Sequence, residues 1–437
     1  SGTATFGLVL VSFFIIALGF SLQQTAAQPF AIGLGTPETG AHRLNMGGSV
    51  NSFGTLLGPL VVSYLLIGSL DSGKSASIEN IQTLYFFLAG LFIIAALIFA
   101  YAKLPKTTSD EKLEKSPKAM YVLLIIGAIF LPVLFADWAK TVTGLEKSVI
   151  ISGSLIIILI ILFWTMVTAK KNPIGWGAMA YPQLVLGMIA IFIYVGVEVT
   201  IDNNFGALLK KNAFGGKEDS QISHLISLYW GSMMIGRWTG AVSVFNFSKM
   251  VKRILVIVVP FAAFGLILLV NIIKGNEISE FAMYPICIAI AVIAFLYAED
   301  KPVKLLLTVS VLASVAMLIS ITTTGMLANY AIISTGLCTA VMWPCIFALA
   351  INGIGKYTSQ GSAFLIMMIL GGAIIPPTQG SIIDLDPSGD ANVYTFTQLS
   401  YLVPLACFAY LAWHAIQTRS VLKKQGLDVD AQVAASH

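Results

Sequence analysis

Long apolar segments alternate with short polar or charged segments along the whole chain. A run of about twenty apolar residues is long enough to cross a bilayer as a helix. About thirteen such spans are predicted, at residues 5–30, 45–68, 81–102, 119–138, 148–169, 180–208, 222–243, 254–273, 281–298, 303–321, 326–352, 361–383 and 397–417. Because backbone groups in lipid need internal hydrogen-bond partners, the spans are expected to be helical. The pattern predicts an all-α polytopic membrane protein.

The composition agrees with a lipid environment. Of the 437 residues, 57% are hydrophobic and 11% are charged, and the mean hydropathy is +0.87. A net charge of +4 is too mild to indicate nucleic-acid binding. The four cysteines lie in apolar runs without metal-ligand spacing, which predicts free thiols and no metal site, and they are Cys287, Cys338, Cys345 and Cys407.

The basic residues indicate the orientation of the chain. Of the 25 lysines and arginines, 18 fall in one alternating set of loops and 7 in the other. By the positive-inside rule the richer set is cytoplasmic. This orientation places the first residue in the periplasm and the C-terminus in the cytoplasm. It also predicts that an odd number of helices precedes Ser1, although a processed terminus would give the same start.

Unexpected polar groups occur late in the first span and in the second. Gln24 and Gln28 precede Pro29 late in the first span, and Asn51 follows in the second span. Amides in lipid are costly unless they face a cavity or another helix. These side chains therefore predict a binding surface inside the helical bundle.

The motifs around these residues resemble a known family. Several segments in uninterrupted order are similar to the fourth and fifth helices of the fucose/glucose/galactose:cation symporters, a branch of the major facilitator superfamily. They are Gln24-Thr25-Ala26-Ala27-Gln28-Pro29-Phe30, Leu34-Gly35-Thr36-Pro37-Glu38, His42-Arg43-Leu44-Asn45 and Asn51-Ser52-Phe53-Gly54. Later matches are Tyr194-Val195-Gly196-Val197-Glu198, Gly236-Arg237-Trp238-Thr239-Gly240, Trp343-Pro344-Cys345-Ile346-Phe347, and the segments 355–362 and 371–377.

The resemblance implies a major facilitator fold without the family's first three helices and with two additional hairpins. Residues 1–102 would form the second half of the N-terminal bundle. Residues 103–177 would form a cytoplasmic linker and one extra hairpin, at about 119–169. Residues 178–424 would form the C-terminal bundle with the other hairpin at about 281–321, and 425–437 a cytoplasmic tail. The hairpins either dock a membrane partner or decorate the periphery.

The resemblance also suggests the substrate. In the fucose/proton symporters the position of Gln24 holds a glutamate that takes up the coupled proton, and an amide cannot titrate. The glucose/galactose members carry glutamine there, which favours those hexoses, with fucose still possible. Sugar recognition needs neutral hydrogen-bonding groups and aromatic faces. The predicted substrate-binding residues are Gln24, Gln28, Asn51, Tyr194, Asn204 and Trp343.

Cation coupling is predicted to involve two carboxylates. Glu198 and Asp202 are four residues apart and so share one helical face. Together they could share a proton or bind sodium, although Asp202 could instead lie in water at the end of its helix. No resident cofactor is expected. Arg43 and Arg237 are predicted to act in gating.

These features favour one of three functional classes. The leading one is a secondary transporter in a bacterial inner membrane that imports a monosaccharide by cation symport with alternating access. The alternative is a non-transporting sugar sensor or membrane-complex subunit. An enzyme is not expected, because the sequence has no HExxH, GxSxG or Walker motif.

Overall fold

The computed structural model describes residues 2–35, 39–67, 78–105, 115–245, 247–299, 301–387 and 389–427. All regular elements within these ranges are helices, which confirms the predicted all-α class. Residues 36–38 of the quoted loop motif and residues 428–437 of the predicted tail lie outside the described residues.

The helices of the first 171 residues form two groups. The first group is α1 (Gly2–Gly33), α2 (Gly40–Ile67) and α3 (Ile78–Tyr101). The second is α4 (Pro117–Leu134), α5 (Ala136–Thr143) and α6 (Lys147–Lys171). The α4–α6 group corresponds to the first predicted hairpin, and its turn ends at Gly144, which has the positive φ of 71° that glycine adopts without strain.

The remaining helices form one continuous set. They are α7 (Pro182–Leu209), α8 (Asp219–Ala241), α9 (Lys249–Ile273), α10 (Tyr284–Ala298), α11 (Pro302–Thr322), α12 (Gly325–Thr339), α13 (Met342–Ile351), α14 (Thr358–Met367), α15 (Gly371–Ile383), α16 (Thr395–Leu399) and α17 (Leu402–Lys424). The predicted span 326–352 is therefore broken into α12 and α13. Pro344 lies in the first turn of α13, where a missing N–H costs no helical hydrogen bond.

Eleven helical segments among the described residues are long and apolar enough to cross a membrane. This confirms a polytopic membrane protein. Two predicted spans, 45–68 and 222–243, are not among the eleven. Both correspond to helices, α2 and α8, whose sequences carry many small and polar residues. The count of thirteen crossings remains a prediction.

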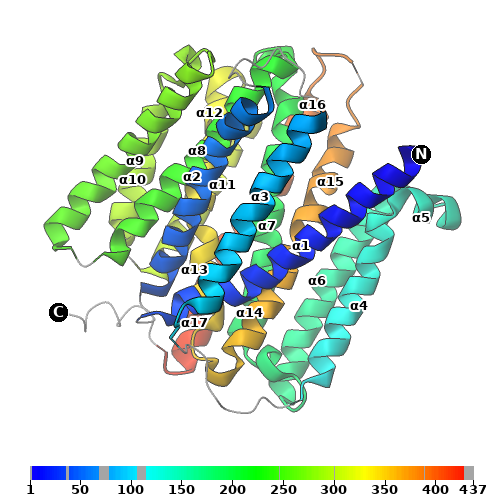
Figure 1. Cartoon of the computed structure of the whole chain (residues 1–437). Coiled ribbons are helices and arrows are strands. Elements are labelled where there is room, and N and C mark those ends of the chain that lie inside the picture. Colours follow the sequence, from blue (N-terminus) through cyan, green and yellow to red (C-terminus); the bar gives the residue numbers. More distant parts are fainter. Residues whose placement is uncertain are drawn as a thin grey trace.

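The arrangement of the helices separates the two predicted hairpins (Figure 1). The α4–α6 group lies at one edge of the bundle, and α9 and α10 lie at the opposite edge. α6 packs against α7 and α15, whereas α11 packs along α17 and α12. The two helices of the second hairpin thus differ in their neighbours, because α10 packs against α9, α11 and α12 at the edge while α11 packs mainly against α17 and α12.

Asp386 ties the loop after α15 to the start of α16. Its carboxylate accepts hydrogen bonds from the Phe396 N–H at 3.0 Å, the Thr397 N–H at 2.7 Å and the Thr397 hydroxyl at 2.7 Å. Burial by itself would raise the pKa of this carboxyl, but the hydrogen bonds from Thr397 and Phe396 outweigh it and hold the pKa below the ordinary value.

We expect Asp386→Asn to lower thermal stability at neutral pH. A carboxyl whose pKa is depressed in the folded state stabilises the protein above its unfolded pKa, and this contribution disappears as the pH falls through the folded pKa. The melting temperatures of the wild type and the variant should therefore converge below about pH 4, the ordinary pKa range of aspartate. A constant difference from pH 7 to pH 3 would contradict this role.

Candidate functional site

A cavity of about 430 Å³ lies between α1 and α2 on one side and α7, α8 and α13 on the other. This volume is in the range of small-molecule sites. The cavity brings together most of the predicted site residues, namely Gln24, Gln28, Arg43, Asn51, Tyr194, Glu198, Arg237 and Trp343. Residues separated by up to 319 positions in sequence therefore meet at a single surface that only the tertiary fold creates.

Two glutamines and a tryptophan form a polar chain across the cavity. The Gln28 amide N–H donates to the Gln24 side-chain oxygen at 2.7 Å, because the two residues are one helical turn apart on α1. The Trp343 indole N–H reaches the Gln28 oxygen at 3.5 Å. The chain links α1 with α13 and leaves amide groups that can also bind a polar ligand.

Aromatic side chains form one wall of the cavity. The Tyr194 and Trp343 rings lie 6.1 Å apart, and Phe347 supports Trp343 from behind at 5.9 Å. The Tyr194 hydroxyl is buried and lies next to the Glu198 carboxylate. The aromatic wall therefore adjoins an acidic group of α7.

A charged pair lies beside this wall. An Arg237 guanidinium nitrogen is 3.9 Å from Glu198 Oε1, and the two side chains are only 17% and 13% exposed. The Tyr229 hydroxyl donates to the Glu198 backbone carbonyl at 3.1 Å, which helps to hold this part of α7 in place. The sequence could not identify an acidic partner for Arg237, and the structure places Glu198 in that position.

Asp202 and Asn204 do not line the cavity. Asp202 lies one turn beyond Glu198 and accepts a hydrogen bond from the Trp230 indole at 2.8 Å. Asn204 donates to the backbone carbonyls of Thr200 at 3.0 Å and Pro376 at 3.3 Å, and so links α7 to α15. The coupling role of Asp202 and the sugar-binding role of Asn204 remain predictions, without support from the position of either side chain.

Arg43 lies in the first turn of α2, just before the predicted span 45–68. Its guanidinium donates to the Ala31 carbonyl at 2.7 Å and also contacts the Ile32 carbonyl and the Thr39 hydroxyl. These contacts satisfy carbonyls at the end of α1 that have no helical partner. Arg43 therefore joins α1 to α2 at the margin of the cavity.

Asn45 lines the cavity but was not predicted as a site residue. It is 1% exposed, and its side-chain oxygen has no hydrogen-bond partner among the described residues. In the sequence, the available indication that Asn45 is a site residue was its position six residues before Asn51, in a helix rich in small residues. The sequence alone could not show that α8 packs against the opposite face of α2.

The first half of α2 is bound to the last turns of α8. His42 Nδ1 lies 2.9 Å from the Gly240 carbonyl oxygen, and the Trp238 indole donates to the Ser49 carbonyl at 3.2 Å. Arg237 donates to the Ser52 hydroxyl at 2.8 Å. The two helices approach closely because Gly240 has no side chain. A Cβ there would lie 2.7 Å from the Asn45 side-chain nitrogen.

We expect Gly240→Val to separate α2 from α8 at this end of the bundle, because the added methyl groups cannot fit against Asn45. Spin labels at Met46 and Phe245, which are 42% and 47% exposed, would report the separation as longer distances in pulsed electron paramagnetic resonance. Gly265→Val on α9 is the matched control, since nothing lies within 4 Å of its added Cβ. Wild-type distances in Gly240→Val would contradict the close contact.

Comparison with known proteins agrees with this geometry. No protein-family model matches the chain. It is 26% identical to a glucose/galactose transporter of Brucella abortus, over 94% of this chain and 71% of that protein. It is 24% identical to an L-fucose-proton symporter of Haemophilus influenzae, over 96% and 76%. The crystal structure of the Escherichia coli fucose:proton symporter superposes with a TM-score of 0.59 and 19% identity, covering 96% of this chain and 78% of that one.

The chain thus shares its overall fold with the fucose:proton symporter structure, and a polar cavity lies between its helical groups. The relatives are named as glucose/galactose transporters and L-fucose-proton symporters, which agrees with the resemblance found in the sequence motifs.

Proposed function

We propose that the protein imports a monosaccharide by cation symport with alternating access, and that glucose or galactose is favoured over fucose. The observation that carries this proposal is the composition of the cavity. Neutral amides from α1 and α2 face aromatic rings from α7 and α13, and a carboxylate-guanidinium pair lies beside them. Sugar transport by the related proteins supports the same function.

Gln24, Gln28 and Asn51 are proposed to bind the sugar hydroxyls. Amides both donate and accept hydrogen bonds, as hydroxyls do, so a pyranose can replace the water at these side chains. The faces of Tyr194 and Trp343 would cover the apolar face of the sugar ring. Glutamine at position 24, where the resemblance places glutamate in fucose symporters, favours glucose or galactose.

Glu198 is proposed to carry the coupled proton. In the cavity, its charge is balanced by Arg237 at 3.9 Å, a distance that leaves room for rearrangement. Protonation of Glu198 would release Arg237 to interact more strongly with Ser52 on α2. Proton coupling is supported by the relatives that are named proton symporters, and sodium coupling is an outcome of the test below. Asp202 would contribute to coupling only because it lies one helical turn from Glu198 on α7.

The contact between α2 and α8 is proposed to be one of the two gates. Arg237 takes part in this contact through Ser52, and Arg43 lines the adjacent cavity from the start of α2, in keeping with their predicted gating role. By the distribution of basic charge this gate would face the cytoplasm of a bacterial inner membrane, with the first residue in the periplasm and the C-terminus in the cytoplasm. The division into residues 1–102, 103–177 and 178–424, with a tail at 425–437, belongs to the same proposal.

The extra helices of the two hairpins are proposed to lie outside the transport pathway. Neither α4 nor α6 contributes a residue to the cavity, and neither do α10 and α11. A membrane partner at the hairpins would be compatible with this position. A sugar sensor that does not transport would use the same cavity, but the relatives favour transport.

Uptake of labelled glucose, galactose and fucose into liposomes containing the protein would test the proposal. We expect accumulation of glucose or galactose under an imposed proton gradient and none without it. The same uptake measured under a sodium gradient would test for sodium coupling. Sugar binding without uptake under either gradient would identify a sensor and refute the transport proposal.

A further inference from the structure

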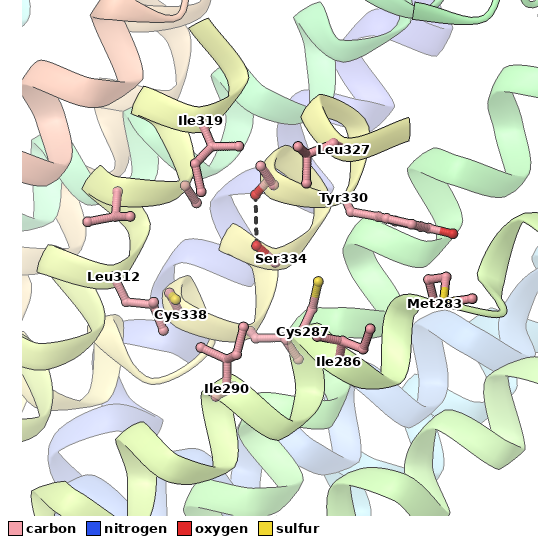
Figure 2. A pocket seen from close by; sticks show the side chains of 15 residues that line it. Met283, Ile286, Cys287, Ile290, Leu312, Ile319, Leu327, Tyr330, Ser334 and Cys338 are labelled. Atoms are coloured by element: carbon pink, nitrogen blue, oxygen red, sulfur yellow. Dashed lines mark hydrogen bonds between the residues drawn. The ribbon is translucent and has the colours of Figure 1, made fainter. Parts of the chain in front are cut away.

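A second cavity, of about 420 Å³, lies away from the transport cavity, between α10, α11 and α12 (Figure 2). Its floor is made of small buried side chains, which are Ala291, Ala316, Ala331 and Cys338. Larger side chains from all three helices, such as Ile286, Ile319 and Leu327, line the same cavity (Figure 2). Small residues where three helices meet leave space that larger side chains would have filled.

The walls of this groove are apolar and exposed at the surface of the bundle. Met283, Ile286 and Leu327 are 61%, 59% and 59% exposed. The groove lies on helices that span the membrane, so its surroundings are lipid. The Ser334 hydroxyl already donates to the Ala331 carbonyl at 2.8 Å. The interior therefore offers no free polar group for a sugar, and its chemistry matches a hydrocarbon chain.

One end of the groove adjoins a charged cluster. Tyr330 lines the groove, and its hydroxyl donates to the backbone carbonyl of Glu280. The Glu280 carboxylate forms an ion pair with Lys217 and lies 2.9 Å from His224 Nε2. Both Lys217 and Glu280 keep some exposure, at 17% and 24% of their side chains. An ammonium group and a carboxylate are thus presented together beside the apolar groove.

We propose that this groove binds one acyl chain of a phosphatidylethanolamine, with the headgroup against Lys217 and Glu280. Lys217 would bind the phosphate, and Glu280 would accept a hydrogen bond from the ethanolamine ammonium, since a carboxylate can accept about four. A phosphatidylglycerol offers no cation to Glu280, and a phosphatidylcholine has no N–H to donate. The charge pattern therefore selects the zwitterionic lipid with a primary ammonium.

Native mass spectrometry of the whole protein, with phosphatidylethanolamine, phosphatidylcholine and phosphatidylglycerol of identical acyl chains, would test this site. We expect one retained phosphatidylethanolamine. Ala331→Phe and Ala316→Phe fill the groove from different helices, and each should weaken retention about tenfold, the equivalent of about two buried methylenes. Ile293→Phe, on the lipid-exposed side of α10 and outside the groove, is the matched control and should bind as the wild type does.

The Glu280→Gln variant tests recognition of the headgroup independently of acyl-chain binding in the groove. This variant should bind phosphatidylethanolamine less tightly and so narrow its advantage over phosphatidylcholine, because an amide oxygen is a weaker acceptor for the ammonium than a carboxylate is. Undiminished phosphatidylethanolamine retention in both phenylalanine variants would overturn the groove as the site. Equal retention of the three lipids by the wild type would overturn the headgroup assignment. Neither result depends on whether the protein transports sugar.

Discussion

Glu198→Gln is expected to abolish accumulation of sugar against its gradient while leaving sugar binding and exchange intact. The amide keeps the size of the side chain, but it carries no charge and cannot take up a proton. Sugar binding should survive because Gln24, Gln28 and Asn51 are unchanged. The measurement is proton-driven uptake in liposomes, compared with counterflow of labelled sugar when no gradient is applied.

Asp202→Asn is the matched control for this prediction. It removes a carboxylate one turn away on the same helix, but from a side chain that binds Trp230 outside the cavity. We expect it to retain most proton-driven accumulation. Loss of accumulation in Asp202→Asn but not in Glu198→Gln would transfer the coupling role to Asp202. Full accumulation in both variants would exclude the two carboxylates as the proton carriers.

Gln28→Ala is expected to weaken sugar binding about 10- to 100-fold, because a lost buried hydrogen-bond partner costs about 1–3 kcal/mol. Gln28 lies at the centre of the polar chain that joins Gln24 to Trp343, so its removal leaves both neighbours without a partner in the cavity. Coupling should persist, since Glu198 is unchanged. Isothermal titration calorimetry with glucose and galactose would measure the affinity.

Thr25→Ala controls for a general effect of shortening a side chain on α1. The Thr25 hydroxyl donates to the Ser21 carbonyl within its own helix, and the residue does not line the cavity. Its affinity should equal that of the wild type. A double Gln24→Ala, Gln28→Ala variant should lose less than the sum of the single losses, because the two amides share a hydrogen bond. Wild-type affinity in Gln28→Ala would place the sugar elsewhere.

The sequence was most informative where polar groups occur in apolar spans. Gln24, Gln28 and Asn51 were predicted as site residues because lipid makes unpaired amides costly, and all three line the cavity. The same reasoning was less selective at Asn204. A buried amide can be satisfied by a ligand or by a neighbouring helix, and the contact with the Pro376 carbonyl on α15 depends on a residue 172 positions away.

Residues that share a helical face by their spacing can contact different partners once the helices pack together. Glu198 and Asp202 share a face of α7 by spacing, but α8 presents Arg237 to the first and Trp230 to the second. Likewise, the predicted hairpin at 281–321 is continuous in sequence, but α11 is packed along α17 and α12 while α10 lies at the edge. Hydropathy does not distinguish a lipid-facing helix from one that faces other apolar helices.

By itself, the sequence determined the membrane class, the all-helical fold, a resemblance to sugar symporters and a group of polar residues with an unfavourable position in lipid. These follow from local rules, because a span in lipid needs about twenty apolar residues and internal backbone hydrogen bonds. Only the tertiary structure decided that Glu198 pairs with Arg237, that Asn45 joins the cavity and that Asp202 does not. Such contacts depend on how helices distant in sequence rotate and pack against one another, which hydropathy and helical period do not specify.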